Sequence, residues 1–245
     1  MKNFMMLLAV ILVSCMNSGP AQQEEAGLPQ VSASYGCAPK TVDAEWYAKD
    51  NIAPIIKGLD VLNYKITTSV PEAQKYFNQG LVLSYGFNHA EAARSFYYAT
   101  RLDPDCAMCY WGYALVLGPN YNMGMDPGNY ERAWEAIQKA IEVSGEATEK
   151  EKALISALAQ RYVAEPVEDR RDLDIKYSEA MKELYTRYDT DPEIAALYAE
   201  SVMDLYPWNL YDKNGKPHEW TPDVIALLEK VMKEYPDHPG AHHFY

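Results

Sequence analysis

Residues 73–104 read AQKYFNQGLVLSYGFNHAEAARSFYYATRLDP, and this stretch decides the fold. A short turn at residues 86–88 separates two apolar-rich segments. In the second segment Ala92, Phe96 and Ala99 recur at intervals of four and three, which places them on one face of a helix. The stretch therefore predicts two antiparallel helices packed against each other.

The rest of the chain carries the same kind of pattern. Strand-type alternation is hard to find after residue 70, whereas helix start signals are frequent. Ser69 with Glu72 and Thr148 with Glu151 have the spacing of a capping box, and Asp191 precedes a proline as a capping residue does. The amphipathic stretches predict eight helices, at residues 72–85, 89–101, 106–117, 130–143, 149–162, 173–188, 193–206 and 223–235. The predicted fold class is all-α.

The first predicted helix pair resembles a tetratricopeptide repeat, a unit of about 34 residues that forms a helical hairpin. The matching residues are Tyr76, Gly80, Ala92, Phe96, Ala99 and Pro104. The small residues among them let two helices approach, and the aromatic residues fill the gap beside them. Gln79 departs from the pattern, because an apolar residue is usual at its position. Residues 107–140 follow the same pattern with an insertion at 118–126, and later units match more weakly.

A family resemblance rests on residues 87–96, 102–108, 110–112 and 117–120. These segments resemble a group of bacterial exported tetratricopeptide proteins, closely over about residues 70–125 and loosely beyond. The resemblance implies a helical-repeat solenoid with a concave groove and a scaffold role. It implies no catalytic residues, since members of the group largely lack a defined activity.

The N-terminus predicts export and a lipid anchor. Lys2 precedes an uncharged apolar run at residues 4–13, which is too short to span a bilayer. The run ends Leu12-Val13-Ser14-Cys15, which resembles a bacterial lipobox with Cys15 as the acylated residue. We expect a signal peptide at 1–14, a flexible tether at 15–40, a lead-in segment at 41–70 and tetratricopeptide-like repeats at 71–245. The expected location is the cell envelope, on the outer membrane or facing the periplasm.

Charge narrows the partner class. Asp and Glu outnumber Lys and Arg by 35 to 22, a net charge of −13, and no basic cluster suits phosphate groups. Nucleic acid is therefore not a predicted partner. The sequence has no nucleophile elbow, phosphate loop, dinucleotide fingerprint or metalloprotease motif, so neither catalysis nor a cofactor is predicted. The predicted partners are therefore a protein or peptide and the membrane, which the protein contacts through its lipid anchor.

Cys106 and Cys109 lie three residues apart at a predicted helix start. The favoured interpretation is a structural disulfide or two buried thiols, and the alternatives are a redox pair or half of a zinc site. A zinc site would need a second such pair, and the four cysteines of the chain do not provide one. His238, His242 and His243 cluster near the last residue. A capping or packing role is favoured over metal binding, because Pro239 and Gly240 lie between His238 and His242 and the two need not share a helix face. A redox or metal-binding protein that uses these cysteines and histidines is the alternative function.

Residues offset from the packed face of the first repeat are the predicted partner-binding groove. They are Gln74, Phe77, Leu81 and Ser84, joined by the polar Asn88, His89 and Arg94 at the following turn. The alternative for the polar group is local structure: Asn88 caps the second helix, and Arg94 pairs with Glu91 on its surface.

The repeat pattern also predicts that further sequence belongs after residue 245. Pro239 falls at the same junction as Pro104, so Phe244 and Tyr245 begin another first helix without its partner. The apolar residues of the preceding helix, Val224, Leu227, Leu228 and Val231, are then expected to lack a cover.

Overall fold

The computed structural model describes residues 44–49 and 51–245. The helices in these residues are α1 (Ala44–Ala48), α2 (Pro71–Tyr85), α3 (His89–Leu102), α4 (Ala107–Leu117), α5 (Tyr130–Glu142), α6 (Glu149–Ala159), α7 (Arg171–Arg187), α8 (Pro192–Asp204), α9 (Thr221–Glu234) and α10 (Pro239–Phe244). Within the same residues, strand-like pairing is limited to two isolated bridges. None of the described helices is long and apolar enough to cross a membrane.

The predicted all-α fold is confirmed, and helices α2 to α9 match the eight predicted stretches with shifts of a few residues at their ends. The capping box of α6 forms as predicted, because Thr148 accepts from the Glu151 N–H and Glu151 accepts from the Thr148 N–H. The other capping box does not form. Helix α2 begins at Pro71, so its N-cap is Val70, and Ser69 lies one residue too early.

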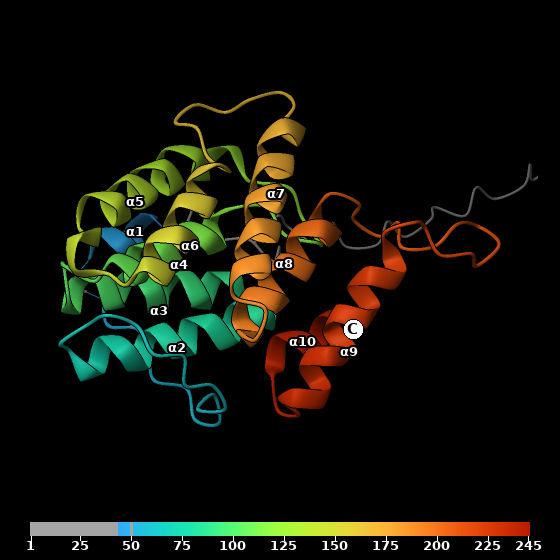
Figure 1. The fold of residues 1–245 in the computed structure, drawn as a ribbon. Coiled ribbons are helices and arrows are strands. Elements are labelled where there is room, and N and C mark those ends of the chain that lie inside the picture. The colour runs from blue at the N-terminus through green and yellow to red at the C-terminus, as the bar shows by residue number, and fades with distance from the viewer. Residues whose placement is uncertain (1–43, 50) are drawn as a thin grey trace, which may run out of the picture. The chain divides into compact units, whose positions relative to one another are not determined.

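Each helix from α2 to α9 packs on the next one, and α2 with α4 and α4 with α6 also touch (Figure 1). The chain also closes on itself, because α10 packs on both α8 and α2. The contact is close: a Cβ added to Gly240 of α10 would lie 2.8 Å from the Tyr85 ring of α2. An array in which each helix pair touched only its neighbours would lack this return to α2.

Two glycines set the distance between α2, α3 and α4. The Phe96 ring of α3 lies over Gly80 of α2 and Gly112 of α4, where an added Cβ would meet ring carbons at 2.8 Å and 2.3 Å. The pairing of Gly80 with Phe96 is the close approach that the repeat pattern predicts. Gly112 has the same role in the contact between α3 and α4.

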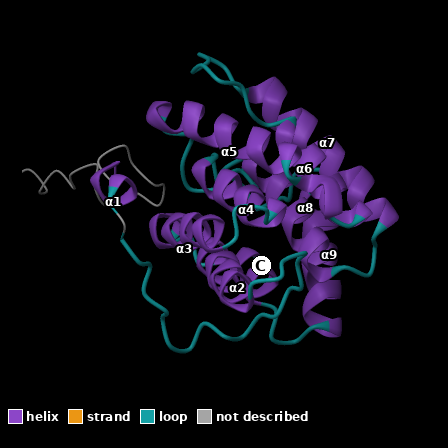
Figure 2. Ribbon diagram, turned by 90° about the vertical axis from the view of Figure 1, so that its left-hand side faces the viewer, coloured by secondary structure: helices purple, strands orange, loops and turns teal. Residues whose placement is uncertain are grey.

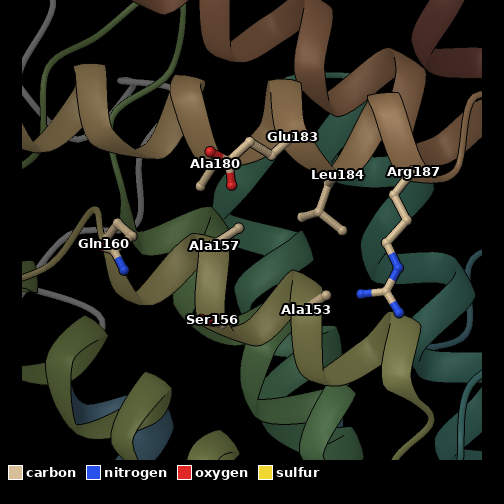
Figure 3. A pocket seen from close by; sticks show the side chains of 8 residues that line it. All are labelled: Ala153, Ser156, Ala157, Gln160, Ala180, Glu183, Leu184 and Arg187. Atoms are coloured by element: carbon tan, nitrogen blue, oxygen red, sulfur yellow. The ribbon is translucent and has the colours of Figure 1, made fainter.

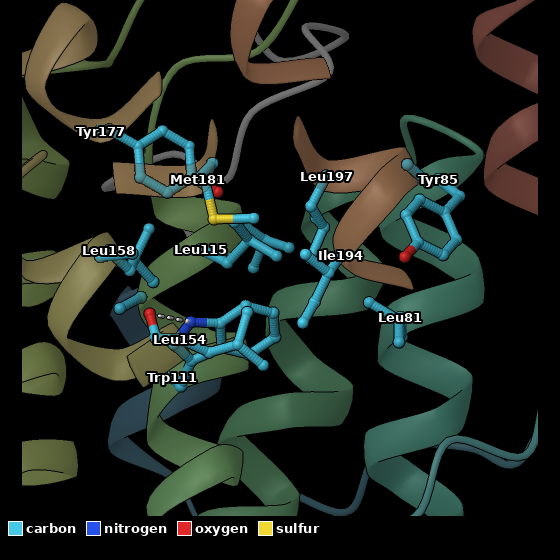
Figure 4. Packing of buried hydrophobic residues seen from close by; sticks show 14 of the residues in the cluster. Leu81, Tyr85, Trp111, Leu115, Leu154, Leu158, Tyr177, Met181, Ile194 and Leu197 are labelled. Atoms are coloured by element: carbon cyan, nitrogen blue, oxygen red, sulfur yellow. Dashed lines mark hydrogen bonds between the residues drawn. The ribbon is translucent and has the colours of Figure 1, made fainter. Parts of the chain in front are cut away.

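The main core lies where α2, α4, α6, α7 and α8 meet (Figure 4). Its largest side chain is Trp111 of α4, which is buried and donates its indole N–H to the Leu154 carbonyl of α6 at 3.2 Å. The indole therefore keeps a hydrogen-bond partner in an otherwise apolar site. A smaller buried cluster surrounds Cys106 and Cys109.

Residues 51–70 of the lead-in segment run beside α2 without forming a helix (Figure 2). Gln79 of α2 holds it, accepting from the Ile56 N–H at 2.8 Å and donating to the Pro54 carbonyl at 3.0 Å. Further along, the Glu151 carboxylate accepts from both the N–H and the hydroxyl of Thr67 at 2.6 Å. The polar residue that departs from the repeat pattern at position 79 therefore has a structural reason.

The expectation of an uncovered face on α9 is wrong for this structure. Val224, Leu227, Leu228 and Val231 are all buried, since α9 packs against α8 and α10. Phe244 of α10 is buried too, with its ring 5.8 Å from that of Tyr85, while Tyr245 is exposed.

Candidate binding site

The predicted groove on α2 is not open. Phe77 and Leu81 are 0% and 1% exposed, and Ser84 is buried as well, so these residues cannot contact a partner. The prediction assumed that one face of α2 stays free. In the structure the lead-in segment covers that helix, and the Tyr64 ring stacks 6.4 Å from Phe77. Gln74 also binds the segment, accepting from the Ile66 N–H at 3.1 Å and donating to the Tyr64 carbonyl at 2.8 Å.

The polar residues near the start of α3 separate into different environments. Asn88 is exposed at the N-cap, but its side chain makes no capping hydrogen bond. His89 is buried, with Nδ1 3.2 Å from Nδ2 of Asn120, and burial lowers the pKa of His89 to about 4. Arg94 pairs with Glu91, as the local-structure alternative expects. These residues do not form one surface.

Cys106 and Cys109 form a disulfide, with their Cα atoms 5.3 Å apart. Cys106 is also the N-cap of α4, because its sulfur accepts from the Cys109 N–H at 3.2 Å. Both residues are 0% exposed. A partner thiol would need to reach a buried sulfur, so the geometry favours a structural role over redox exchange.

The C-terminal histidines do not act together. His238 is buried and caps α10, accepting from the Ala241 N–H at 3.0 Å, while His242 and His243 are exposed. Within the described residues, no group of three His, Cys, Asp or Glu side chains could hold a metal ion. Cys15 and the segment that resembles a lipobox lie outside the described residues.

A cleft that the sequence did not single out lies over α3, α4 and α5. It has a volume of about 360 Å³. Its lining comprises Tyr47 of α1, Tyr97 and Thr100 of α3, Tyr110 and Tyr113 of α4, and Arg132, Glu135, Ala136 and Lys139 of α5. We call it the tyrosine cleft.

Three rings of the tyrosine cleft pack on one another, Tyr47 edge to face on Tyr97 and Tyr113 tilted against both. The Tyr47 and Tyr97 ring centroids are 5.0 Å apart at 89°, and those of Tyr97 and Tyr113 are 5.4 Å apart. Arg132 fixes one side, since its guanidinium lies 4.3 Å from the Tyr47 ring centroid and donates to the Tyr113 hydroxyl. Edge-to-face and cation–π contacts stabilise this arrangement beyond the area that they bury. The wall of the cleft is therefore preorganised.

The rim of the cleft is polar and carries both signs of charge. Glu135 is exposed and Lys139 is half-buried, one turn apart on α5. Tyr110 is half-buried, and burial raises its pKa, so its hydroxyl keeps its proton at neutral pH and can donate a hydrogen bond. The cleft thus offers flat apolar faces with hydrogen-bonding groups at their edges.

A signal for this cleft exists in the sequence. Arg132, Glu135 and Lys139 follow each other at intervals of three and four on one helix face, and Tyr110 and Tyr113 are three apart on another. Tyr47 gave no such signal, because it belongs to a five-residue helix that lies far before the other cleft residues in the sequence. The twenty tyrosines of the sequence also hide the few that converge.

A smaller hollow of about 290 Å³ lies between α6 and α7 (Figure 3). Ala153, Ala157 and Ala180 line it together with the exposed Gln160, Glu183 and Arg187. It contains no buried polar side chain that would orient a ligand, so it is the weaker candidate. Comparison with protein-family models, curated proteins and solved structures found no match for the chain.

Proposed function

We propose that this protein is a binding protein that holds an extended segment of a partner protein in the tyrosine cleft. The observation that carries the proposal is the wall of mutually packed rings from Tyr47, Tyr97 and Tyr113, fixed by Arg132 and open to a volume of about 360 Å³. The volume lies within the range of known ligand pockets, roughly 300–1,000 Å³.

Tyrosine suits this role for a physical reason. Its ring offers a large contact area with only two side-chain torsions to immobilise, and its hydroxyl can bond to a peptide backbone. Tyr and Arg are also enriched among the residues that dominate binding energy in protein interfaces. An apolar, aromatic or proline side chain of the partner would lie against the rings, with its backbone near Tyr110 and Thr100.

The proposal includes a scaffold of tetratricopeptide type. The helix pairing of α2 with α3 and of α4 with α5, and the close approach at Gly80, support it. In this scaffold the tyrosine cleft takes the place of the groove that the sequence pattern put on α2. No catalytic group is part of the proposal.

Replacing Tyr110 by alanine is expected to weaken partner binding about tenfold or more, because the partner loses both an aromatic contact and a hydrogen-bond donor at the edge of the cleft. Peptides selected from a displayed random library on the wild-type protein provide the probe, and fluorescence anisotropy gives the dissociation constants. Tyr211→Ala is the matched control, since Tyr211 is 49% exposed and lies outside the cleft.

Selected peptides should share an aromatic or proline residue and bind Tyr211→Ala as they bind the wild type. If they bind Tyr110→Ala and Tyr97→Ala with unchanged affinity, the cleft is not the binding site. Melting curves of each variant show whether a loss of affinity comes with a loss of fold.

The proposal places the protein at the cell envelope, anchored by lipid on Cys15. Its support is the sequence Leu12-Val13-Ser14-Cys15 alone. Two or more acyl chains hold a protein stably on a bilayer, whereas one does not. Cys15→Ala is therefore expected to abolish incorporation of labelled fatty acid and to move the protein out of the membrane fraction. Undiminished label in the variant would contradict the anchor, and Cys37→Ala serves as the control.

A further inference from the structure

A second cavity, of about 420 Å³, has no lining residue in common with the tyrosine cleft, so a ligand bound there does not depend on the proposed function. The lead-in segment, the start of α8, the end of α9 and the loop between α9 and α10 line it. We call it the acidic pocket. Its lining consists of Val61, Leu62, Asn63, Tyr64, Pro192, Glu193, Glu234, Tyr235, Pro236, Asp237 and His238.

Two buried ionisable residues meet in the wall of the acidic pocket. Glu193 is 3% exposed and His238 is 4% exposed, and Glu193 Oε1 lies 3.1 Å from His238 Nε2. The other carboxylate oxygen of Glu193 accepts from the Tyr85 hydroxyl. The buried carboxylate is therefore fixed in position from two sides.

The tautomer of His238 follows from its cap. Because Nδ1 accepts from the Ala241 N–H, the neutral ring carries its proton on Nε2, the nitrogen that lies 3.1 Å from Glu193 Oε1. Despite its short distance to Oε1, Nε2 makes no aligned hydrogen bond within the described part of the chain. The ring N–H therefore lies beside a carboxylate without good alignment, which weakens the hydrogen bond between them.

Tyr64 presents a second buried polar atom without a partner. Tyr64 lines the pocket, and its buried hydroxyl makes no hydrogen bond with any described residue. Burial raises the pKa of Tyr64, and the carboxylates of Asp191 and Glu193 raise it further, so the hydroxyl stays protonated. Tyr64 and His238 therefore both line the cavity beside the buried Glu193, and each has a buried polar atom without an aligned hydrogen bond.

The charge of the lining is negative. Glu193, Glu234 and Asp237 line the pocket, and no lysine or arginine is among the described residues that line it. Lys150 pairs with the Asp191 carboxylate at 2.7 Å and lies 4.7 Å from the Tyr64 ring centroid, so it borders the pocket but is not among its lining residues. A cation entering the pocket would therefore meet net negative charge, from the exposed Glu234 and Asp237 near the solvent and from the buried Glu193 in the wall.

We propose that the acidic pocket binds an organic cation, a primary ammonium or guanidinium group on an alkyl stem, with Glu193 as the buried counter-ion. The exposed Tyr235 ring lines the path of the stem and offers a face for cation–π contact, as the Tyr64 ring does to the Lys150 ammonium, 4.7 Å from its centroid. Glu234 and Asp237, both exposed, lie nearer the solvent and attract the cation to the pocket. The volume accommodates an alkyl stem as long as that of a lysine or arginine side chain.

An organic cation fits this lining better than an anion or a bare metal ion. The lining carboxylates would repel an anion. They also do not converge with a third ligand as a metal site requires, within the residues that the structure describes. An alkyl stem, in contrast, benefits from Val61, Leu62 and the two tyrosine rings along its length.

The test uses probes whose only charge is on the side chain. The Nα-acetyl methylamides of lysine and arginine mimic a basic residue of a peptide, n-butylammonium and n-butylguanidinium mimic a free amine, and Nα-acetyl-norleucine methylamide is the neutral control. Binding to the full chain is measured by titration calorimetry and by the imidazole proton shifts of His238. Both lysine and arginine derivatives should bind saturably and the norleucine derivative should not.

Glu193→Gln is expected to weaken binding about ten- to a hundredfold, the loss of one hydrogen bond to a charged group. Because Glu193 is buried, a second variant is needed that does not disturb packing. Glu234→Gln with Asp237→Asn changes only exposed groups, and roughly a two- to tenfold weaker affinity is expected from the lost attraction. Glu183→Gln is the matched control, since Glu183 is an exposed carboxylate outside the pocket.

The outcomes separate cleanly. Binding of the residue derivatives but not the butyl cations identifies a basic side chain of a partner as the ligand, and equal binding of both identifies a free amine; both results support the pocket. Equal binding of the norleucine derivative overturns the proposal. So does an affinity that neither Glu193→Gln nor the Glu234→Gln, Asp237→Asn double variant changes.

Discussion

Replacing Gly112 by leucine is expected to lower the stability of the helical domain by about 3 kcal/mol or more, the upper end of the usual cost of overpacking. The reason is the absence of space: an added Cβ would lie 2.3 Å from Phe96 Cε1 and 2.4 Å from Cδ1. The Phe96 ring cannot yield easily, because it is 0% exposed and lies over Gly80 on its other side. For a domain of this size the melting midpoint should fall by roughly 6–12 °C.

Gly124→Leu is the matched control, because nothing lies within 4 Å of an added Cβ there. Gly112→Ala should fall between the two. A double-mutant cycle with Phe96→Leu tests the cause, since a smaller side chain should relieve the crowding and make the two changes non-additive. If Gly112→Leu melts as Gly124→Leu does, α3 and α4 are not as close as described.

The close packing of α2 and α3 could be predicted from the sequence. Gly80, Ala92 and Phe96 lie within one local pattern, and helical periodicity makes such a pattern visible over about fifteen residues. The short helices α1 and α10 were less visible, because five or six residues hold little more than one turn of the period.

The prediction of an open groove on α2 failed for a different reason. The spacing of Phe77 and Leu81 gives the direction in which each side chain leaves the helix, but not what lies on that side. The lead-in segment covers α2 through backbone hydrogen bonds to Gln74 and Gln79, and its own sequence has no periodic pattern. Coverage by an irregular segment is therefore a property of the tertiary structure, and only the polar residue at position 79 hinted at it.

The acidic pocket and the tyrosine cleft also differ in how far the sequence alone could predict them. The cleft is built largely from α3, α4 and α5, which are neighbours along the chain, so periodicity on single helices marks most of its residues. The pocket joins Tyr64, Glu193 and His238 across about 170 residues, and no local pattern connects them. The contact of α10 with α2 and α8 is what brings them together.

The second large effect on stability is expected from disrupting a buried charge network around Arg161. Arg161 follows α6 and is 2% exposed, and it donates to Asp174 of α7 at 3.0 Å and to Asp204 of α8 at 2.7 Å. Arg170 completes the network by donating to Asp174 and to the Arg161 carbonyl. One guanidinium thus ties three consecutive helices together.

Replacing Arg161 by methionine is expected to cost about 3–5 kcal/mol at pH 8, because it leaves the buried Asp204 carboxylate without its partner. Asp174 keeps Arg170 and should suffer less. Arg187→Met is the control, since Arg187 is exposed on α7. Adding Asp204→Asn to the variant should restore some of the lost stability, because the uncompensated charge is then gone.

The loss should also depend on pH in a direction that identifies the buried carboxylate. Burial raises the pKa of Asp204, and Arg161 opposes this rise, so removing Arg161 raises the pKa further. A carboxyl group whose pKa is higher in the folded than in the unfolded state binds its proton more tightly when folded. Its stabilising contribution is therefore present at low pH and is lost as the pH rises through the folded-state pKa. Chemical denaturation at pH 5 and pH 8 should show the smaller loss for Arg161→Met at pH 5, and an equal loss at both values would mean that Asp204 is not left charged in the core.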